Sequence, residues 1–439
     1  MITSLSLENF KSWRKLDKTR FAPITGFFGA NSSGKSSILQ FLLILKQTVE
    51  LKDTAVTLFL GDRHSRVELG TYRDIIFRHD TSQSLRWHLG IDTGDYRIFE
   101  FRAECYLAQT IAMREMRYRF PKIEHSEAEI GNVYSEIGKP PQLIATGELD
   151  KSEEDLAPES LYPSPSFQSV KFSRFADGTP KSLLQVHYEQ MGQSGLEDTL
   201  ESLLYLTAVR ATPQRETVWG GSNFSDVGAQ GERTIDVILA ANSQEGSPPF
   251  LEERVAYWLK TLGLLHSFRV SEVAPNTNLY RVYIKQSEEA TEVLLSDVGF
   301  GLSQILPVLT LCFMAPEGSI VLLEHPEMHL HPTVQSGLAD ALIDAMQTRK
   351  IQIILESHSE HFLMRLQRRV AEEKITNEDV ALYFCEAKEG ESHCTELQIT
   401  PYGEITNWPR DFFGDQFGEL SKMQDAAIER KMAKVPVTV

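Results

Sequence analysis

The chain has 439 residues, of which 41% are hydrophobic and 24% charged, so it can bury one large core or two ordinary ones. Its formal charge of −17 argues against a protein coated along its length by nucleic acid. There is no apolar run of the roughly 20 residues that cross a bilayer, no charged leader before an apolar stretch, and no CxxC among the four cysteines. We therefore expect a cytoplasmic protein with no membrane partner, disulfide framework or zinc ribbon.

The N-terminal part of the chain is rich in strand patterns. A short strand over residues 2–7 precedes a turn at Asn9, and a second strand covers residues 21–28. Alternating aromatic and β-branched residues predict antiparallel strands over residues 66–69, 84–91 and 96–106. A sheet that includes antiparallel strands is therefore expected here.

A glycine loop follows the second strand. Residues 29–36 read GANSSGKS, which matches the phosphate-binding pattern GxxxxGK[ST], and a helix is predicted over residues 37–45. The glycines let backbone N–H groups point at a phosphate, and the helix start adds its positive dipole end. Lys35 would contact the β- and γ-phosphates, and the Ser36 hydroxyl would bind Mg²⁺. The remaining predicted contacts are Asn31, Ser32, Ser33, Gly34 and Ser37. The alternative is a glycine-rich turn that merely contains a lysine.

The middle of the chain changes in composition. Residues 121–169 are rich in Glu, Ser, Pro and Gly without a periodic apolar pattern, which predicts an irregular or mobile insertion. Regular patterns resume near residue 169, with a short helix over 197–206, a strand over 205–209 and an amphipathic helix over 250–264.

Two buried strands in the C-terminal half end in polar residues. Residues 320–323 are aliphatic and lead into Glu324, as in a buried parallel strand whose carboxylate emerges at the sheet edge and serves Mg²⁺. Residues 350–359 form a second such strand, and His358 would contact the γ-phosphate or the attacking water. The alternative for His358 is a cap on the following helix, residues 360–373.

A third feature is the loop at residues 294–306, where Gly299, Gly301 and Ser303 open an apolar helix. Free N–H groups at a helix start bind anions. A site on the far edge of the same subunit could not reach its own P-loop. We therefore expect this loop to act in trans, in a head-to-tail dimer with nucleotide at the interface.

The order of these motifs resembles the ABC-type ATPase heads of the SMC, RecF and OLD-like families. Residues 5–12, LSLENFKS, are similar to the entry strand of those families, and residues 297–304, DVGFGLSQ, occupy the signature position. Residues 324–332, EHPEMHLHP, together with 356–361, ESHSEH, and 408–413, WPRDFF, resemble a stand-alone prokaryotic branch often found in genome-defence loci. The resemblance covers residues 1–110 and 200–415.

The resemblance implies ATP and Mg²⁺ as ligands and a role for each motif residue. Ser36 and Glu324 would serve the metal, His358 would be the switch histidine, and Gly301 with Ser303 would contact the γ-phosphate in trans. ABC enzymes usually carry a glutamate directly after the Walker B acid, and here that position is His325. Either His325 is the general base, or Glu327 extends into the site and takes that role, or ATP hydrolysis is slow.

The expected fold is an α/β P-loop NTPase of the ABC-ATPase head type, with a mixed central sheet, an antiparallel β subdomain and an irregular or helical insertion. The expected domains are an ATPase lobe over residues 1–110, an insertion over 111–200, a second lobe over 201–415 and a tail over 416–439. The expected activity is an ATPase that forms a homodimer or higher oligomer and controls a separate effector, a nuclease or toxin, in antiphage defence. The alternatives are a RecF- or SMC-like DNA-repair clamp and a hydrolysis-poor, ATP-gated scaffold. Only about eighty residues follow His358, which is too few for an appended nuclease domain.

Two weaker patterns, one for metal binding and one for nucleic-acid binding, each have an alternative interpretation. Histidines and acids within residues 324–331, and separately Cys385, His393 and Cys394, have ligand chemistry for a transition metal, but alternate residues of a strand diverge. Two arginine clusters, at residues 114–119 and 365–369, are candidates for DNA or RNA contact. Such clusters are more often solvated faces balanced by nearby acids.

Overall fold

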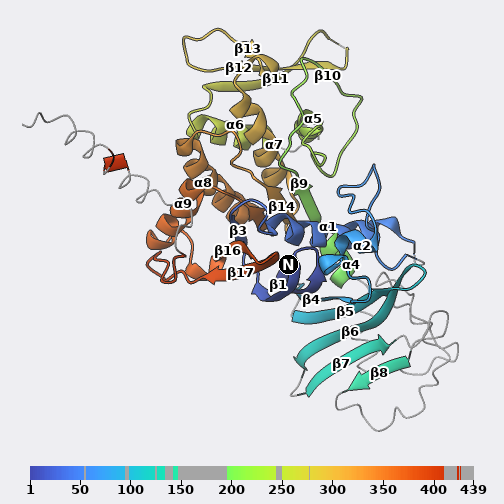
Figure 1. Cartoon of the computed structure of the whole chain (residues 1–439). Coiled ribbons are helices and arrows are strands. Elements are labelled where there is room, and N and C mark those ends of the chain that lie inside the picture. Colours follow the sequence, from blue (N-terminus) through green and yellow to red (C-terminus); the bar gives the residue numbers. More distant parts are fainter. Residues whose placement is uncertain are drawn as a thin grey trace, which may run out of the picture.

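The computed structural model describes residues 1–53, 56–93, 98–123, 126–133, 142–146, 195–243, 250–275 and 277–409, with three isolated residues, 423, 424 and 426. Three sheets are formed by these residues. Figure 1 shows an antiparallel sheet at the lower right, a central sheet, and a helical lobe capped by a small sheet at the top.

The antiparallel sheet has the strand order β2-β1-β4-β5-β6-β7-β8. Its strands are β1 (Ile2–Phe10), β2 (Trp13–Arg20), β4 (Leu85–Asp92), β5 (Ile98–Leu107), β6 (Ile111–Ile123), β7 (Ser126–Val133) and β8 (Gln142–Thr146). The central sheet has the order β17-β16-β3-β15-β14-β9, with β3 (Ile24–Gly29), β9 (Leu203–Leu206), β14 (Ile320–Glu324), β15 (Gln352–Glu356), β16 (Val380–Lys388) and β17 (Glu391–Leu397). All its pairs are parallel except β16 with β17.

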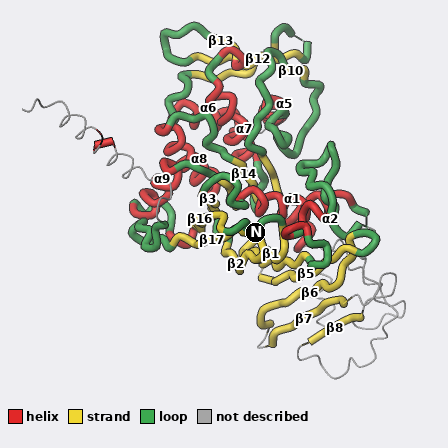
Figure 2. Tube along the Cα trace, viewed as in Figure 1, coloured by secondary structure: helices red, strands yellow, loops and turns green. Residues whose placement is uncertain are grey.

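One face of the central sheet is covered by α1 (Lys35–Leu51), and the other by α7 (Phe300–Met314) and α8 (Pro332–Arg349), with α9 (Glu360–Ala371) packed on α8 (Figure 2). The other helices are α2 (Tyr72–Ile75), α4 (Gly195–Glu201), α5 (Thr234–Ser243) and α6 (Phe250–Thr261). The small sheet consists of β10 (Thr217–Val218), β11 (Ser267–Glu272), β12 (Leu279–Lys285) and β13 (Val293–Leu294).

Alternate side chains of the parallel strands pack into two different hydrophobic cores. Ile320 and Leu322 belong to a buried cluster with α1 and the antiparallel sheet, whereas Val321 and Leu323 belong to one with α5–α9. Because neighbouring residues of a strand point to opposite faces, an all-aliphatic strand must be covered on both sides. The expected P-loop NTPase fold, with a mixed central sheet and an antiparallel subdomain, is confirmed.

A buried glutamine ties the N-terminus to the central sheet. Gln352 accepts a hydrogen bond from the Ile2 N–H (2.9 Å) and donates to the carbonyls of Ile2 (2.7 Å) and Ala22 (3.1 Å). A buried amide with its partners satisfied fixes one register. The contact joins the two sheets at the base of the P-loop strand.

Several predicted boundaries were wrong. Residues 66–69 are not a strand: the Val67 carbonyl is bound by the Gln47 side chain (3.3 Å), and Leu69 bonds only Leu60 (2.9 Å). The helix expected over 197–206 ends at Glu201, because Leu203–Leu206 pairs with β14 as a strand.

The segment predicted to be irregular or mobile, residues 121–169, is strand where it is described. Residues 121–123, 126–133 and 142–146 continue the antiparallel sheet. The expected domain boundary at residue 110 falls between the paired strands β5 and β6, and the expected 111–200 insertion ends in helix α4. The other residues of 121–169 and most of the predicted tail lie outside the described residues.

Candidate functional site

The predicted phosphate loop connects β3 to α1. Gly29 has φ 131°, and an added Cβ would lie 1.9 Å from the Cys385 carbonyl oxygen, so only glycine fits there. Gly34 has φ 89° and precedes the first residue of the helix, while Ala30, Asn31 and Ser32 are exposed. The loop therefore opens to solvent at a helix start, which is the geometry that a phosphate requires.

The Lys35 ammonium lies inside this loop. It donates to the carbonyls of Gly29 (3.2 Å) and Ala30 (2.7 Å) and to the Ser33 hydroxyl (3.4 Å). Burial lowers the pKa of Lys35, and the nearby Glu356 opposes that shift. A lysine held by backbone carbonyls at the loop is well placed to contact bound phosphates.

The Ser36 hydroxyl contacts a carboxylate that the sequence did not single out. It donates to both oxygens of Glu356, at 3.1 and 2.8 Å. Glu356 is the last residue of β15, pairs in register with Glu324 of β14, and is 1% exposed. The signal was present in the sequence, since residues 353–355 are aliphatic and lead into an acid as residues 320–323 do.

Glu324 is held on its other side. Its carboxylate accepts hydrogen bonds from the Tyr205 hydroxyl (2.9 Å), the Thr207 hydroxyl (3.2 Å) and the Ala208 N–H (3.3 Å). Burial and the charge of Glu356 raise the pKa of Glu324. The structure thus places Glu324 beside β9 and Glu356 beside the predicted Mg²⁺ ligand.

His325 follows β14 in a left-handed backbone conformation, with φ 42°. Arg210 stabilises this turn from below: its guanidinium donates to the carbonyls of Ala208 (2.7 Å), Glu324 (2.9 Å) and His325 (3.3 Å). Strained backbone of this kind persists only where its surroundings hold it. Arg210 is buried and supports the turn that presents His325.

Two acids and two histidines gather in front of this turn. The His325 imidazole lies 3.2 Å from Glu356 and 3.9 Å from Glu327, and its ring stacks on His358 with centroids 4.9 Å apart. Burial alone would lower the pKa of His325, but its interactions with the carboxylates of Glu327 and Glu356 raise it to about 9. Burial, Lys35 and His325 lower the pKa of His358. One ring is therefore cationic at neutral pH and its stacked neighbour is neutral.

Glu327 lies under this pair. One of its oxygens accepts from the His358 backbone N–H (2.8 Å), and the other is buried with no hydrogen-bond partner in the described part of the chain. Burial would raise the pKa of Glu327, but its hydrogen bonds with His325 and His358 lower it. An ionised carboxylate with a free oxygen has the chemistry of a base. His325, as a cation, has it only after losing a proton.

The cap on the helix after His358 is a different residue. Ser359 accepts from the Phe362 N–H (3.0 Å) and is the N-cap of α9. The alternative in which His358 caps that helix is therefore wrong, and its ring is available to the site.

The predicted signature residues lie at the start of α7. Gly299 precedes the helix with open space around its Cα, while the Ser303 hydroxyl donates to the Phe300 carbonyl (2.7 Å). An added Cβ on Gly301 would lie 3.2 Å from the His329 carbonyl oxygen. Over the described ranges, no hydrogen bond or ion pair joins residues 299–303 to residues 29–37.

The proposed transition-metal ligands do not converge. Within the described residues, no group of three or more His, Cys, Asp or Glu side chains is arranged to hold a metal ion. Cys385 and Cys394 lie opposite each other on β16 and β17 with sulfurs 3.5 Å apart, as two thiols. An Mg²⁺ ion held partly by ATP needs fewer protein ligands, and the oxygens of Ser36 and Glu356 suit it.

Both arginine clusters are paired with acids. Arg365 and Arg369 bind Asp340, and Arg368 binds Glu372 (2.6 Å). On the antiparallel sheet, Arg114 binds Glu104 (2.8 Å). The expectation that nearby acids balance these arginines is confirmed, although the Arg365 and Arg369 side chains are partly buried.

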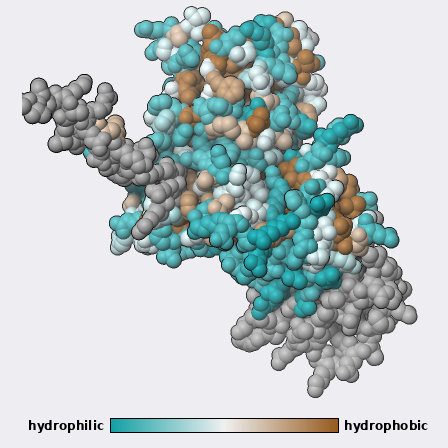
Figure 3. All heavy atoms as spheres, viewed as in Figure 1, coloured by the Kyte–Doolittle hydropathy of each residue, from teal (hydrophilic) through white to brown (hydrophobic). Residues whose placement is uncertain are grey.

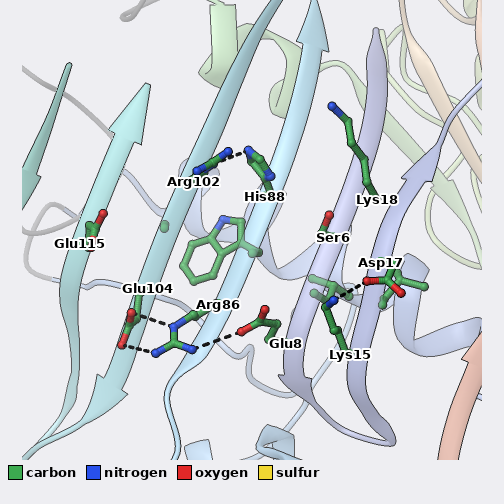
Figure 4. Close-up of a pocket in the computed structure, with 14 residues that line it drawn as sticks. Ser6, Glu8, Lys15, Asp17, Lys18, Arg86, His88, Arg102, Glu104 and Glu115 are labelled. Carbon is green, nitrogen blue, oxygen red and sulfur yellow. Dashed lines mark hydrogen bonds and ion pairs between the residues drawn. The ribbon is translucent and has the colours of Figure 1, made fainter. Parts of the chain in front are cut away.

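The open face of the antiparallel sheet carries a groove of about 470 Å³. Figure 4 shows charged side chains paired along one strand, with Lys15 beside Asp17 (2.6 Å), and across strands, with Arg86 between Glu8 (3.2 Å) and Glu104 (2.8 Å). The groove therefore presents mixed, neutralised charge and not a basic strip.

A bilayer-spanning helix is not found in the part of the chain that the structure describes.

Comparison with known proteins gives matches at both ends of the chain. Residues 1–108 match the AAA ATPase domain, residues 207–365 match the AAA domain described as putative AbiEii toxin of a type IV toxin–antitoxin system, and residues 375–423 match a protein family of unknown function, DUF3696. No curated protein matches the sequence.

Solved SMC head domains are also similar. The head bound to the C-winged helix domain of ScpA has 12% identity, covers 91% of this chain and 98% of its own, and gives a TM-score of 0.44. The Pyrococcus furiosus head with an extended coiled coil, bound to the C-terminal domain of ScpA, has 12% identity, 97% and 99% coverage and a TM-score of 0.42. The Thermotoga maritima head has 12% identity, 91% and 99% coverage and a TM-score of 0.39.

The two ATPase-domain matches contain the P-loop, Glu324 and His358, and the fold brings these segments together at one edge of the central sheet. Residues 1–108 and 207–365 are thus similar to ATPase domains of the AAA type, and the chain is an ATPase with this P-loop fold.

Proposed function

We propose that this ATPase dimerises around nucleotide and uses the bound and hydrolysed states to control a separate effector, a nuclease or toxin, in prokaryotic antiphage defence. The AbiEii description of the model matching residues 207–365 supports a defence role. The motif order supports an ABC-type head. Cytoplasmic localisation is part of the same proposal.

The observation that supports dimerisation best is the isolation of the signature loop. Gly299 and Phe300 are exposed at the start of α7, a 15-residue helix whose first N–H groups lack intrahelical partners. Nothing in the described chain brings this loop to its own P-loop. A second copy would supply the missing half of each site.

The surface of the upper lobe fits a protein contact. In Figure 3 hydrophobic residues are more frequent over the α5–α7 lobe than around the central sheet. Exposed apolar side chains on α6 and α7 include Phe250, Tyr257 and Phe300. Apolar surface of this kind is typical of interfaces.

Each site residue has a part to play when ATP and Mg²⁺ are bound. ATP would supply the γ-phosphate, and Mg²⁺ held by Ser36 and a strand-end carboxylate would neutralise negative charge at the phosphates. Lys35 and the N–H groups of residues 31–37 hold the phosphates, and the His325 imidazolium stabilises negative charge beside them. Glu327 orients or deprotonates the attacking water, and the neutral His358 ring donates or accepts at the site edge.

Mass in solution, measured by light scattering with a non-hydrolysable ATP analogue and Mg²⁺, tests the dimer. We expect the mass to double for the wild type and for Gly220→Glu, and to stay monomeric for Gly299→Glu. Both glycines have no atom within 4 Å of an added Cβ and neither has positive φ, so the same side chain fits at both in the monomer. An unchanged mass for the wild type with analogue bound, or dimerisation of Gly299→Glu, would contradict the proposal.

A second candidate is the hydrolysis-poor, ATP-gated scaffold. His325 favours it, because the position usually held by a glutamate carries a cation that is a poor base. Phosphate release that is negligible while the analogue still doubles the mass would favour this candidate. The DNA-repair clamp would need a basic groove, and the described arginine clusters are neutralised by acids.

A further inference from the structure

The end of β15 carries a carboxylate to which no role is assigned, and it touches the residue expected to bind Mg²⁺. The Ser36 hydroxyl lies 2.8 and 3.1 Å from the two oxygens of Glu356. Neighbouring ligands of an octahedral Mg²⁺, at about 2.1 Å from the ion, lie about 3 Å apart. Ser36 and Glu356 therefore already have the spacing of two adjacent ligands.

The alternative carboxylate, Glu324, is committed elsewhere. Tyr205 donates to one of its oxygens, and Thr207 and the Ala208 N–H donate to the other. All three donors come from β9 and the residues after it. These contacts join the end of β14 to its neighbouring strand, which is a structural task.

Strand order explains the difference. β15 lies between β3 and β14, so Glu356 ends the strand that adjoins the P-loop strand, with Phe27 as its register partner. Glu324 lies one strand further away. The residue nearer the P-loop meets the hydroxyl at the start of α1.

The buried negative charge at the carboxyl ends of β14 and β15 also favours binding of a cation. Glu356 is almost fully buried and is in register with a second buried acid. Two like charges held close in a buried place are costly unless a cation or donors offset them. The Ser36 hydroxyl is one such donor to Glu356, and a divalent ion would offset the charge that remains.

We propose that Glu356, and not Glu324, is the carboxylate that holds nucleotide-bound Mg²⁺ together with Ser36, while Glu324 is a structural acid that fixes β14 to residues 205–208. This inference rests on the ATPase function, and it places the acid of the metal site on β15 beside the switch histidine.

The test compares Mg²⁺-dependent nucleotide binding in Glu356→Gln and Glu324→Gln. Calorimetry gives the affinity for the ATP analogue with Mg²⁺ and with EDTA, and the ratio of the two affinities is the readout. We expect Glu356→Gln to lower the ratio about tenfold or more while the affinity in EDTA changes little. Glu324→Gln should keep the ratio of the wild type and melt at a lower temperature.

Electron paramagnetic resonance of Mn²⁺, added with the analogue, counts free metal and reports the same loss without reference to catalysis. Glu356→Asp should recover part of the metal binding, because it restores a carboxylate. A lowered ratio of the two affinities in Glu324→Gln, whether or not Glu356→Gln lowers it too, would overturn the inference. Failure of the wild type to bind the analogue in either condition would instead overturn the ATPase function itself.

Discussion

The two large sheets of this molecule use charged residues in opposite ways. On the antiparallel sheet, the charges lie on the open face and pair across strands, as Arg86 does with Glu104 (2.8 Å) and Lys18 with Glu100 (2.7 Å). In the parallel strands β14 and β15, the acids stand only at the carboxyl ends and are buried. Exposed pairs contribute little in water, whereas buried charges need specific partners. Burial of acids at strand ends, and not the number of charges, distinguishes the candidate site from the rest of the surface.

The largest expected contrast is between two lysines. Lys35→Ala removes the ammonium in the P-loop and should lower phosphate release by about 100-fold or more. Lys18→Ala removes an exposed ammonium on the antiparallel sheet and should leave the rate within about twofold. A steady-state phosphate assay checks both. Equal losses would show that the comparison between the sheets is wrong.

The next contrast is between two neighbouring residues of the candidate site, Glu327 and His325. We expect Glu327→Gln and His325→Ala to differ by about tenfold or more in turnover, because a general base contributes about 10² to 10⁴-fold. The larger loss is expected for Glu327→Gln, since Glu327 keeps a free buried oxygen and the pKa of His325 is raised to about 9. Equal and mild effects of the two substitutions would rule out a base at either position.

A third contrast compares two arginines in stability. Arg210→Ala leaves three carbonyls without their buried donor and should lower the free energy of unfolding by about 3 kcal/mol. Arg86→Ala breaks an exposed cross-strand network and should cost at most about 1 kcal/mol. Urea denaturation measures both. A cost for Arg86→Ala as large as that for Arg210→Ala would overturn the comparison.

The smallest expected effect is a pH dependence in α4. Burial, with the charges of Glu201 and Asp198, raises the pKa of Glu197 to about 7. A folded-state pKa above the unfolded value of 4.5 means that ionisation costs stability as the pH rises from about 4.5 to 7, and the cost persists above that. Glu197→Gln should therefore raise the melting temperature slightly at pH 8 and leave it unchanged at pH 4. A lower melting temperature at pH 8 would contradict this.

The sequence predicted the parts of the fold that local rules decide. The P-loop needs glycines at fixed positions, and aliphatic strands ending in acids must lie in a covered parallel sheet, so β3, β14 and β15 were all found. Strand β2 was missed because its three buried residues, Trp13, Leu16 and Thr19, are spaced three apart and do not show the two-residue period of a strand.

Contacts between distant residues could not be predicted in the same way. Ser36 and Glu356 are 320 positions apart, and only the strand order decides that Glu356 and not Glu324 meets the hydroxyl. An arginine is usually exposed, so the burial of Arg210 could not be predicted from the sequence. It is possible because three carbonyls at and beside the His325 turn accept hydrogen bonds from its guanidinium. The roles of the individual site residues stay predictions.

The most direct test of the P-loop site is phosphate release from ATP by the purified wild-type chain, with Lys35→Ala measured beside it. We expect Mg²⁺-dependent release by the wild type and none by the substituted chain. Release that is unchanged in Lys35→Ala would contradict it, because the edge of the parallel sheet would then not be the catalytic site.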